Sequence, residues 1–267
     1  SITQPNPTPI QRYALPVYLI LTPLISIAIP LLLPGSVEAA VLLMLLVPTG
    51  MAIVLTALAE GRAGLANLLG KLFQWRVSVM GYVLALGLPI VILLAAAVLG
   101  RLLGWVPTLQ VRVPSLSQLG INFVLVLLIA VLEELGWRGY ALPRLLARRS
   151  ALLSALLVGL LWGGLHIPLG VIAGRPWLPS FLAPFGLSVV MTWLFVQTRG
   201  SLTMAMLFHF AVDYLPQFLF GETDLGLAIW LQAMATLGAA LLLRLAYGPS
   251  LQRRLQAELT GYPISPA

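Results

Sequence analysis

Three apolar stretches, each long enough to cross a bilayer, contain side chains that can take part in acid and base chemistry. They are Glu133, Glu134 and Arg138 in VLEELGWRGY, His166 in LLWGGLHIPLG, and His209 and Asp213 in MLFHFAVDYL. The chain has 2 histidines in total, and both lie in this set. An ionisable group inside a membrane span costs on the order of 2.5 to 3.5 kcal/mol, so such groups usually face a protein interior or a water-filled cavity. Their grouping predicts a functional polar site.

Helical spacing assigns different surroundings to the two adjacent carboxylates. Glu134 and Arg138 are four residues apart, so they share a helix face and can form an ion pair. Glu133 lies about 100° around the helix from Glu134 and points elsewhere. We therefore expect one structural acid held by Arg138 and one working acid. Trp162 precedes His166 by four residues, where we expect the indole to pack against the imidazole. The structural alternative is that the ion pair and the histidines only hold helices together.

This combination of groups is typical of a hydrolase. A carboxylate and a histidine can hold and deprotonate a water, and a second histidine can donate a hydrogen bond to an oxyanion. Alternatively, Glu133, His166 and His209 could bind Zn²⁺ and leave a position open for water. The HExxH spacing is absent, there is no cysteine, and no serine lies in a GxSxG motif. We expect no cofactor, with zinc as the alternative.

The composition shows which elements must position these groups. Charged residues make up 9% and hydrophobic residues 60% of the 267 residues, whereas soluble domains carry roughly 25% charged residues. A water-soluble globule is therefore excluded, and we predict an all-α, polytopic membrane helix bundle around a polar cavity. Continuous apolar runs favour helices over barrel strands. We expect about eight spans, at 13–34, 37–59, 77–99, 118–142, 151–169, 181–198, 202–220 and 225–246.

Basic residues indicate the orientation of these spans, because Lys and Arg are retained on the cytoplasmic side. With eight spans, one face carries Arg12, Arg62, Lys71, Arg76, Arg144, Arg148, Arg149, Arg199, Arg253 and Arg254. The opposite face carries Arg101, Arg112 and Arg175. We therefore expect a multi-pass protein of the cell membrane with both termini cytoplasmic. The net charge of +7 is interpreted as a topology signal, and no nucleic-acid partner is expected.

The chain is predicted to form one transmembrane domain, residues 1–247, with the catalytic spans at about 118–220. Residues 248–267 are expected to form a cytoplasmic tail. The N-terminal segment SITQPNPTPIQRYALP lacks the basic region and cleavage site of a signal peptide, so we expect the first apolar block to remain as a span. The expected partners are the lipid bilayer and a membrane-associated peptide or protein substrate.

The three polar stretches resemble the motifs of one known family. They read EELGWR at 133–138, WGGLH at 162–166 and HFAVD at 209–213. These fit the EExxxR signature, the second motif with Trp in place of the usual Phe, and the HxxxN/D signature of the CPBP family, the CAAX protease and bacteriocin-processing enzymes. This family includes the Rce1-type prenyl-protein endopeptidases. The resemblance covers about 132–213 and implies an intramembrane endopeptidase acting on membrane-associated or lipidated substrates, with its cavity approached from the cytoplasmic side.

The resemblance also implies roles for the first two motifs. Glu133 would be the general base and would hold the attacking water together with His166. Glu134 and Arg138 would support this arrangement through their ion pair. The family has been described both as metalloproteases and as metal-independent glutamic proteases, and we favour the glutamic version for this chain.

In the third motif, the resemblance implies that His209 polarises the scissile carbonyl and that Asp213 assists. Asp213 stands where relatives often have Asn, and an ionised Asp cannot donate to an oxyanion. We expect Asp213 to orient His209 instead. Trp162 is expected to alter the shape of the cavity without altering the chemistry.

Two non-proteolytic functions compete with this interpretation. A self-immunity or scaffold protein could retain the fold without activity, but the complete polar set argues against this. A transporter could also place acids and histidines within the membrane. Transporters usually contain repeated halves, and no repeat is visible in the sequence.

Overall fold

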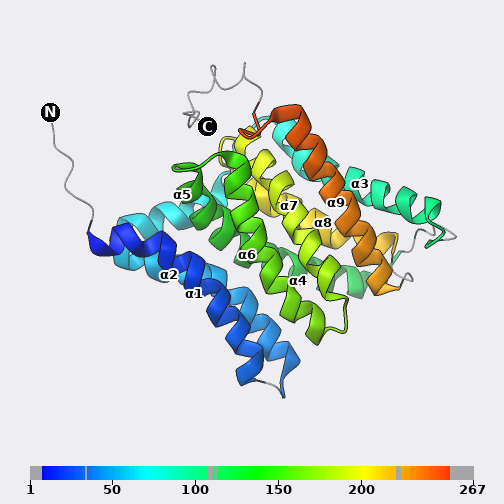
Figure 1. The fold of residues 1–267 in the computed structure, drawn as a ribbon, viewed down its shortest axis with the longest axis horizontal. Helices are drawn as coiled ribbons and strands as arrows, with labels where there is room; N and C mark the ends of the chain where they lie inside the picture. Colours follow the sequence, from blue (N-terminus) through cyan, green and yellow to red (C-terminus); the bar gives the residue numbers. More distant parts are fainter. Residues whose placement is uncertain (1–7, 34, 107–110, 112, 221–223, 253–267) are drawn as a thin grey trace.

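The protein is a bundle of helices in the computed structural model, which describes residues 8–33, 35–106, 111, 113–220 and 224–252 (Figure 1). Every regular element within these residues is helical, which confirms the all-α prediction. The long helices are α1 (Pro9–Leu32), α2 (Val37–Gly70), α3 (Val79–Leu102), α4 (Leu116–Glu134), α6 (Ala151–Ile172), α7 (Trp177–Gln197), α8 (Leu202–Tyr214) and α9 (Leu225–Tyr247). The short ones are η1 (Lys71–Phe73), η2 (Leu135–Ala141), α5 (Leu142–Leu146) and η3 (Leu215–Phe218).

Seven helical segments of the described chain are long and apolar enough to cross a membrane, as expected for a multi-pass protein. The element that falls short is α8, which has 13 residues where the sequence predicts a span over 202–220. At 1.5 Å per residue, α8 covers about 20 Å of a hydrocarbon core of about 30 Å. The chain tightens into the 3-10 helix η3 beyond Tyr214, because Pro216 cannot donate the next α-helical hydrogen bond.

The fourth span is not a uniform α-helix. It runs through α4, the π-helical segment η2 and α5, so that it extends to Leu146 instead of ending near 142. The η2 segment lies against α2, where a Cβ on Gly136 would come within 2.6 Å of the Pro48 backbone. The Thr49 hydroxyl donates to the carbonyl of Leu132 just before this segment. Close contact with α2 thus holds the part of the chain that carries Glu133, Glu134 and Arg138.

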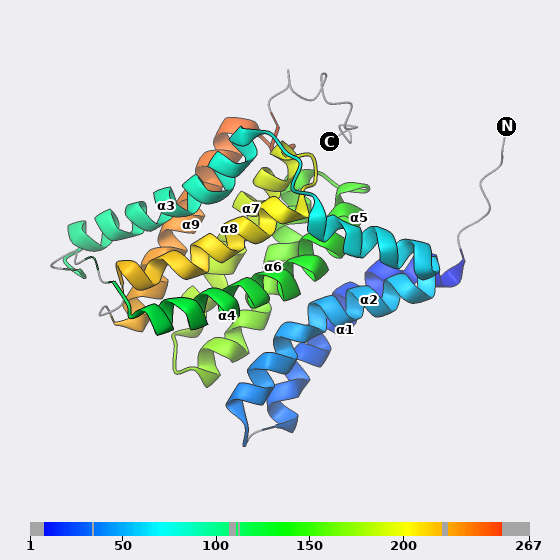
Figure 2. The same cartoon turned by 180° about the vertical axis from the view of Figure 1, so that it is seen from behind.

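Helix α7 lies at the centre of the bundle and is buried along most of its length. It packs against α6 and α9 (Figure 1). Gly159 and Gly163 of α6 permit this approach, since a Cβ on either would lie 3.0 Å or 2.7 Å from the carbonyl oxygens of Phe185 and Phe181. Small residues at this spacing let membrane helices approach closely. Helix α8 lies between α3 and α4 on the other side of the bundle (Figure 2).

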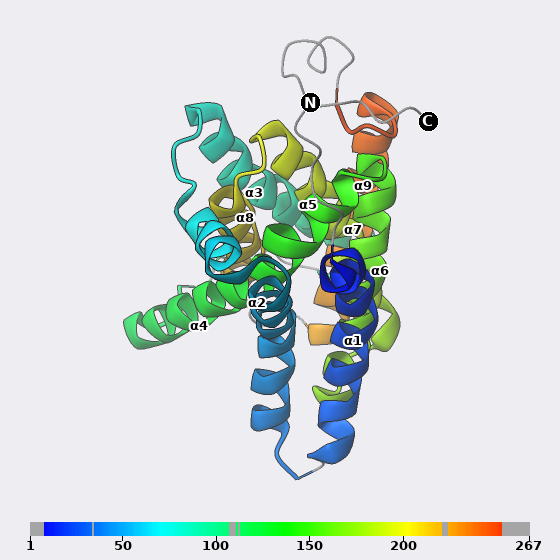
Figure 3. The same ribbon diagram turned by 90° about the vertical axis from the view of Figure 1, so that its left-hand side faces the viewer.

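The helices alternate in direction, so the turn between α1 and α2 lies at the opposite end of the bundle from the C-terminal end of α9 (Figure 3). Helix α9 ends at Tyr247, the predicted end of the transmembrane domain. The next residues still contact the bundle, because the Leu152 amide donates to the Pro249 carbonyl and Leu251 is buried. The rest of the predicted tail, 253–267, lies outside the described residues, as does Arg112.

Candidate active site

The structure brings all seven predicted site residues into one region in the interior of the bundle. They come from four elements, of which α4 and η2 are continuous while α6 and α8 lie further along the chain. Glu133 and Glu134 end α4, Arg138 lies in η2, Trp162 and His166 lie on α6, and His209 and Asp213 lie on α8. Figure 2 shows α8 beside α4, with α6 behind them. The π-helical segment was not predicted from the sequence, and such segments occur frequently at functional sites.

Glu134 links two of the polar groups. Its Oε1 lies 2.8 Å from Nη1 of Arg138, which confirms the predicted ion pair. The same oxygen lies 2.9 Å from Nδ1 of His209, and all three residues are buried. Because the carboxylate is the acceptor, Nδ1 of His209 carries a proton, and its Nε2 points away from Glu134. The ion pair therefore also fixes the orientation of an imidazole 75 residues further along the chain.

Glu133 points in a different direction from Glu134, as the helical spacing predicts. Its Oε2 accepts a hydrogen bond from the indole Nε1 of Trp162 at 3.3 Å and lies 3.6 Å from Nε2 of His209. Only 3% of Glu133 is exposed, yet the side chain lines a cavity. Glu133 can thus act on a molecule inside that cavity, while Glu134 is held by Arg138 and His209.

Trp162 contacts four of the polar residues. Its ring lies under the Arg138 guanidinium at 4.5 Å, and its ring centroid is 5.7 Å from His166 and 5.3 Å from His209, both edge to face. The contact with His166 confirms the packing predicted from the spacing. The hydrogen bond to Glu133 was not predicted, because Trp162 was interpreted as altering only the shape of the cavity. The sequence did contain a signal for this bond, because Trp162 has an indole N–H donor that the usual Phe of the motif lacks.

His166 has one ring nitrogen engaged and one turned away from its own helix. Its Nδ1 lies 2.9 Å from the Trp162 carbonyl, which can only accept, so the proton resides on Nδ1. Nε2 is then an acceptor. The half-buried ring lines the same cavity as Glu133.

Asp213 lies at the rim of the site, with 39% of its side chain exposed. Its Oδ2 is 3.3 Å from Nε2 of His209. The carboxylate therefore faces the nitrogen that points toward the cavity, whereas Glu134 holds Nδ1. Two acids, Glu134 and Asp213, thus lie beside different nitrogens of the His209 ring, where the sequence interpretation expects only Asp213.

The cavity has a volume of about 750 Å³. Most of its wall is apolar, and its polar lining includes Glu133, His166, His209 and Asp213 at one end. Arg175, which follows α6 and was interpreted only as a topology signal, also lines it.

From Glu133, the cavity extends toward the end of the bundle where α6 finishes and α9 begins. The sequence interpretation places Arg175 on the non-cytoplasmic face. With both termini cytoplasmic, as predicted, this cavity extends toward the non-cytoplasmic side. The resemblance, in contrast, implies an approach from the cytoplasm, so the two predictions disagree.

The zinc alternative requires at least three protein donor atoms gathered around one point. Within the described residues, no group of three or more His, Cys, Asp or Glu is arranged to hold a metal ion. Nδ1 of His209 is engaged with Glu134 and Nδ1 of His166 with a backbone carbonyl, as is usual for metal-ligating histidines, so Nε2 is the nitrogen of each ring that could ligate a metal. The side chains as placed do not fit a three-ligand site, so we derive no step through a metal.

Comparisons with known proteins agree with the resemblance found in the motifs. Residues 115–215 match the family of type II CAAX prenyl endopeptidase Rce1-like proteins. A curated protein of the archaeon Methanococcus maripaludis, named CAAX prenyl protease 2, is 34% identical over 100 residues. That alignment covers 33% of this chain and 37% of the relative, so the similarity spans about a third of each protein. The segment that matches the family, residues 115–215, contains all seven site residues.

Proposed function

We propose that this chain, which carries an Rce1-like segment at 115–215, is an intramembrane endopeptidase. The proposal rests on the different surroundings of the two adjacent acids, Glu133 and Glu134. Glu134 is occupied by Arg138 and His209, whereas Glu133 lines a cavity together with His166 and His209. A site with a purely structural ion pair has no need for a second buried acid facing a cavity.

In the first step, Glu133 and Nε2 of His166 hold a water beside the scissile carbonyl. Glu133 removes one proton as the water oxygen bonds to the carbonyl carbon, and the carbonyl π electrons move onto oxygen. Nε2 of His209 donates a hydrogen bond to the resulting oxyanion, with the ring held by Glu134. General base catalysis and oxyanion stabilisation together supply the lowering of the barrier.

In the second step, the oxyanion collapses and the C–N bond breaks. The leaving nitrogen takes the proton from Glu133, which returns to its carboxylate form. The products are a carboxylic acid and a free amine, so atoms and charges balance without another reactant. Asp213, exposed at the rim, holds Nε2 of His209 before substrate arrives and releases it when the carbonyl oxygen takes its place.

The substrate is proposed to be a membrane-associated or lipidated peptide or protein. The largely apolar wall of the cavity supports this, because apolar side chains or a lipid chain can be buried there. The relative's name refers to a prenyl protease, and prenylation occurs on the cysteine of C-terminal CAAX sequences. Cleavage of matched reporter peptides with and without a prenyl group tests this part of the proposal.

The decisive experiment measures cleavage of a membrane-anchored reporter by purified protein. Glu133→Gln, Glu133→Ala and His166→Ala should each lower kcat by about a hundredfold to ten-thousandfold, the usual contribution of general base catalysis. Glu38→Gln, an exposed acid in the first turn of α2, is the matched control and should retain activity. Unchanged cleavage by folded Glu133→Ala would refute the assignment of Glu133 as the base, whereas a cellular phenotype preserved in a Glu133→Ala strain would favour the scaffold function.

The metal-dependent alternative is tested in the same assay. Cleavage is measured after verified metal removal and again after addition of Zn²⁺. We expect activity to persist through chelation, and loss with rescue by Zn²⁺ would establish the zinc version instead.

We also propose the membrane in which the protein resides and the side on which its termini lie. Both termini are cytoplasmic and the protein resides in the cell membrane, which the distribution of arginines over the two ends of the bundle supports. Reporter fusions to each terminus, read on either side of the membrane, test this orientation.

A further inference from the structure

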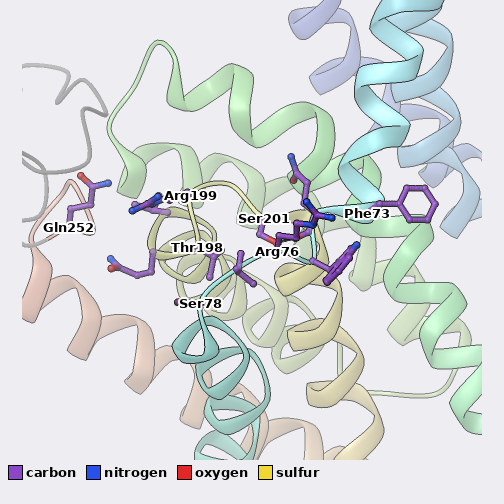
Figure 4. Close-up of a pocket in the computed structure, with 12 residues that line it drawn as sticks. Phe73, Arg76, Ser78, Thr198, Arg199, Ser201 and Gln252 are labelled. Atoms are coloured by element: carbon purple, nitrogen blue, oxygen red, sulfur yellow. Dashed lines mark hydrogen bonds between the residues drawn. The ribbon is translucent and has the colours of Figure 1, made fainter.

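The catalytic cavity extends toward one end of the bundle, and a second pocket lies at the other end. Its volume is about 650 Å³, and it lies between the linker from η1 to α3 and the turn from α7 to α8 (Figure 4). This end also carries Arg144, Arg148 and Arg149. No residue of the catalytic site lines this pocket.

The two walls of this pocket are joined by hydrogen bonds. The Ser201 hydroxyl donates to the Gln74 carbonyl at 2.7 Å, and the Leu202 amide donates to Oε1 of Gln74 at 3.3 Å. On the linker side, the Tyr82 hydroxyl donates to the Trp75 carbonyl at 2.6 Å. The backbone is therefore fixed on both sides of the opening, which reduces the ordering cost of binding.

The charged residues that line this pocket in the described part of the chain are all basic. Arg76 and Arg199 line it, and no acidic residue does. Both arginines are exposed, and neither takes part in an ion pair within the described part of the chain. Figure 4 shows them on different sides of the pocket, with Thr198 and Ser201 between them in this view. The guanidinium donors suit a phosphate group, whereas the Ser201 and Thr198 hydroxyls already donate to the carbonyls of Gln74 and Leu194.

The backbone at Arg199 supports a role for its side chain. Its φ is +56°, in the left-handed region where glycine is preferred. A non-glycine residue in this region carries a conformational cost, which suggests a function for the side chain.

Exposed aromatic residues place the pocket at the level of lipid head groups. Phe73 and Trp75 on the linker are 74% and 57% exposed. The Arg76 guanidinium lies 5.3 Å from the centroid of the Trp75 ring. Aromatic residues beside arginines at the ends of spans are typical of the membrane interface, and basic pockets on the cytoplasmic side bind anionic head groups.

We propose that this pocket binds the phosphate of an anionic phospholipid. Arg76 and Arg199 contact the phosphate region from two sides, and Phe73 and Trp75 lie against the acyl chains at the interface. The ligand chemistry is a phosphate ester, which could also be offered by a free phosphate compound. The experiment separates these two sources.

The test measures binding of phosphatidylglycerol to the full-length chain in detergent, with phosphatidylcholine and inorganic phosphate as separate probes. The double variant Arg76→Gln/Arg199→Gln should bind phosphatidylglycerol about thirtyfold more weakly, from about 1 kcal/mol for each basic residue. Arg148→Gln/Arg149→Gln, which removes two exposed arginines outside the pocket at the same end, should bind as wild type does. Equal weakening in both double variants would refute a specific site and indicate general surface attraction.

A second variant guards against misfolding. Arg199→Gly removes the guanidinium and also relieves the left-handed backbone, so it should fold and still lose lipid binding. Inorganic phosphate should compete weakly with phosphatidylglycerol. If phosphate alone binds as tightly and lipid fails to displace it, the ligand is a soluble phosphate and the lipid proposal is wrong. Wild-type affinity in Arg199→Gly and Arg76→Gln would also overturn it.

Discussion

The indole of Trp162 offers a sharp test of how Glu133 is positioned. Trp162→Phe removes the N–H that donates to Glu133 at 3.3 Å while keeping an aromatic ring beneath Arg138. It also installs the residue usual in the motif that this stretch resembles. We expect Glu133 to lose a defined orientation toward the water, so that kcat falls and KM changes little.

The size of the effect follows from the bond that is lost. A hydrogen bond to a charged group contributes about 1.5 to 3 kcal/mol, and the long distance places this one at the lower end. A barrier raised by about 1.4 kcal/mol slows the reaction about tenfold. Trp162 is a positioning residue, so the expected loss is far smaller than that of Glu133→Ala.

The matched control is Trp193→Phe. Trp193 is also buried on a central helix, but no hydrogen-bond partner for its Nε1 is found among the described residues. Both substitutions remove similar buried volume and should lower the thermal midpoint comparably. The assay follows steady-state cleavage of a membrane-anchored reporter by each variant. Equal kcat for Trp162→Phe and Trp193→Phe would refute the role of the indole, because the lost bond would then contribute nothing beyond packing.

Three further predictions use the same cleavage assay together with thermal unfolding. Gly163→Ala should lower the thermal midpoint strongly because its Cβ would lie 2.7 Å from the Phe181 carbonyl, whereas Gly164→Ala, with open space around it, should be tolerated; equal midpoints would contradict the packing of α6 on α7. Asp213→Asn should retain activity or raise it, since the amide can donate to the oxyanion; loss comparable to that of Glu133→Ala would show that the carboxylate itself is required. Glu134→Gln should lower both stability and kcat, because it leaves Arg138 buried without its charge partner, typically at a cost of about 3 to 5 kcal/mol, and loosens His209; an unchanged midpoint would argue against the structural role of this acid.

The site was largely predictable because charged residues are scarce in this sequence. Where so few are tolerated inside apolar segments, each one that occurs is informative. The four-residue spacing predicted the ion pair of Glu134 with Arg138 and the packing of Trp162 on His166, and both are present. Local spacing suffices for such contacts, since their geometry is set by a single helix.

Contacts between helices could not be predicted in this way. The bond from His209 to Glu134 joins residues 75 positions apart, and its choice of Nδ1 depends on how α8 packs against α4. The η2 segment and the early end of α8 are also matters of packing and backbone hydrogen bonding, which the apolar pattern does not record.

By itself, the sequence determined that this is a helical membrane protein and which side chains gather in its interior, because burial in a bilayer excludes most charges and nearly all unpaired backbone. Tertiary structure alone decided which nitrogen of His209 is engaged and where the cavity leads. Those features depend on the relative position of three helices within a few ångströms. The period of a helix fixes the face on which a residue lies, but only packing fixes what that face meets.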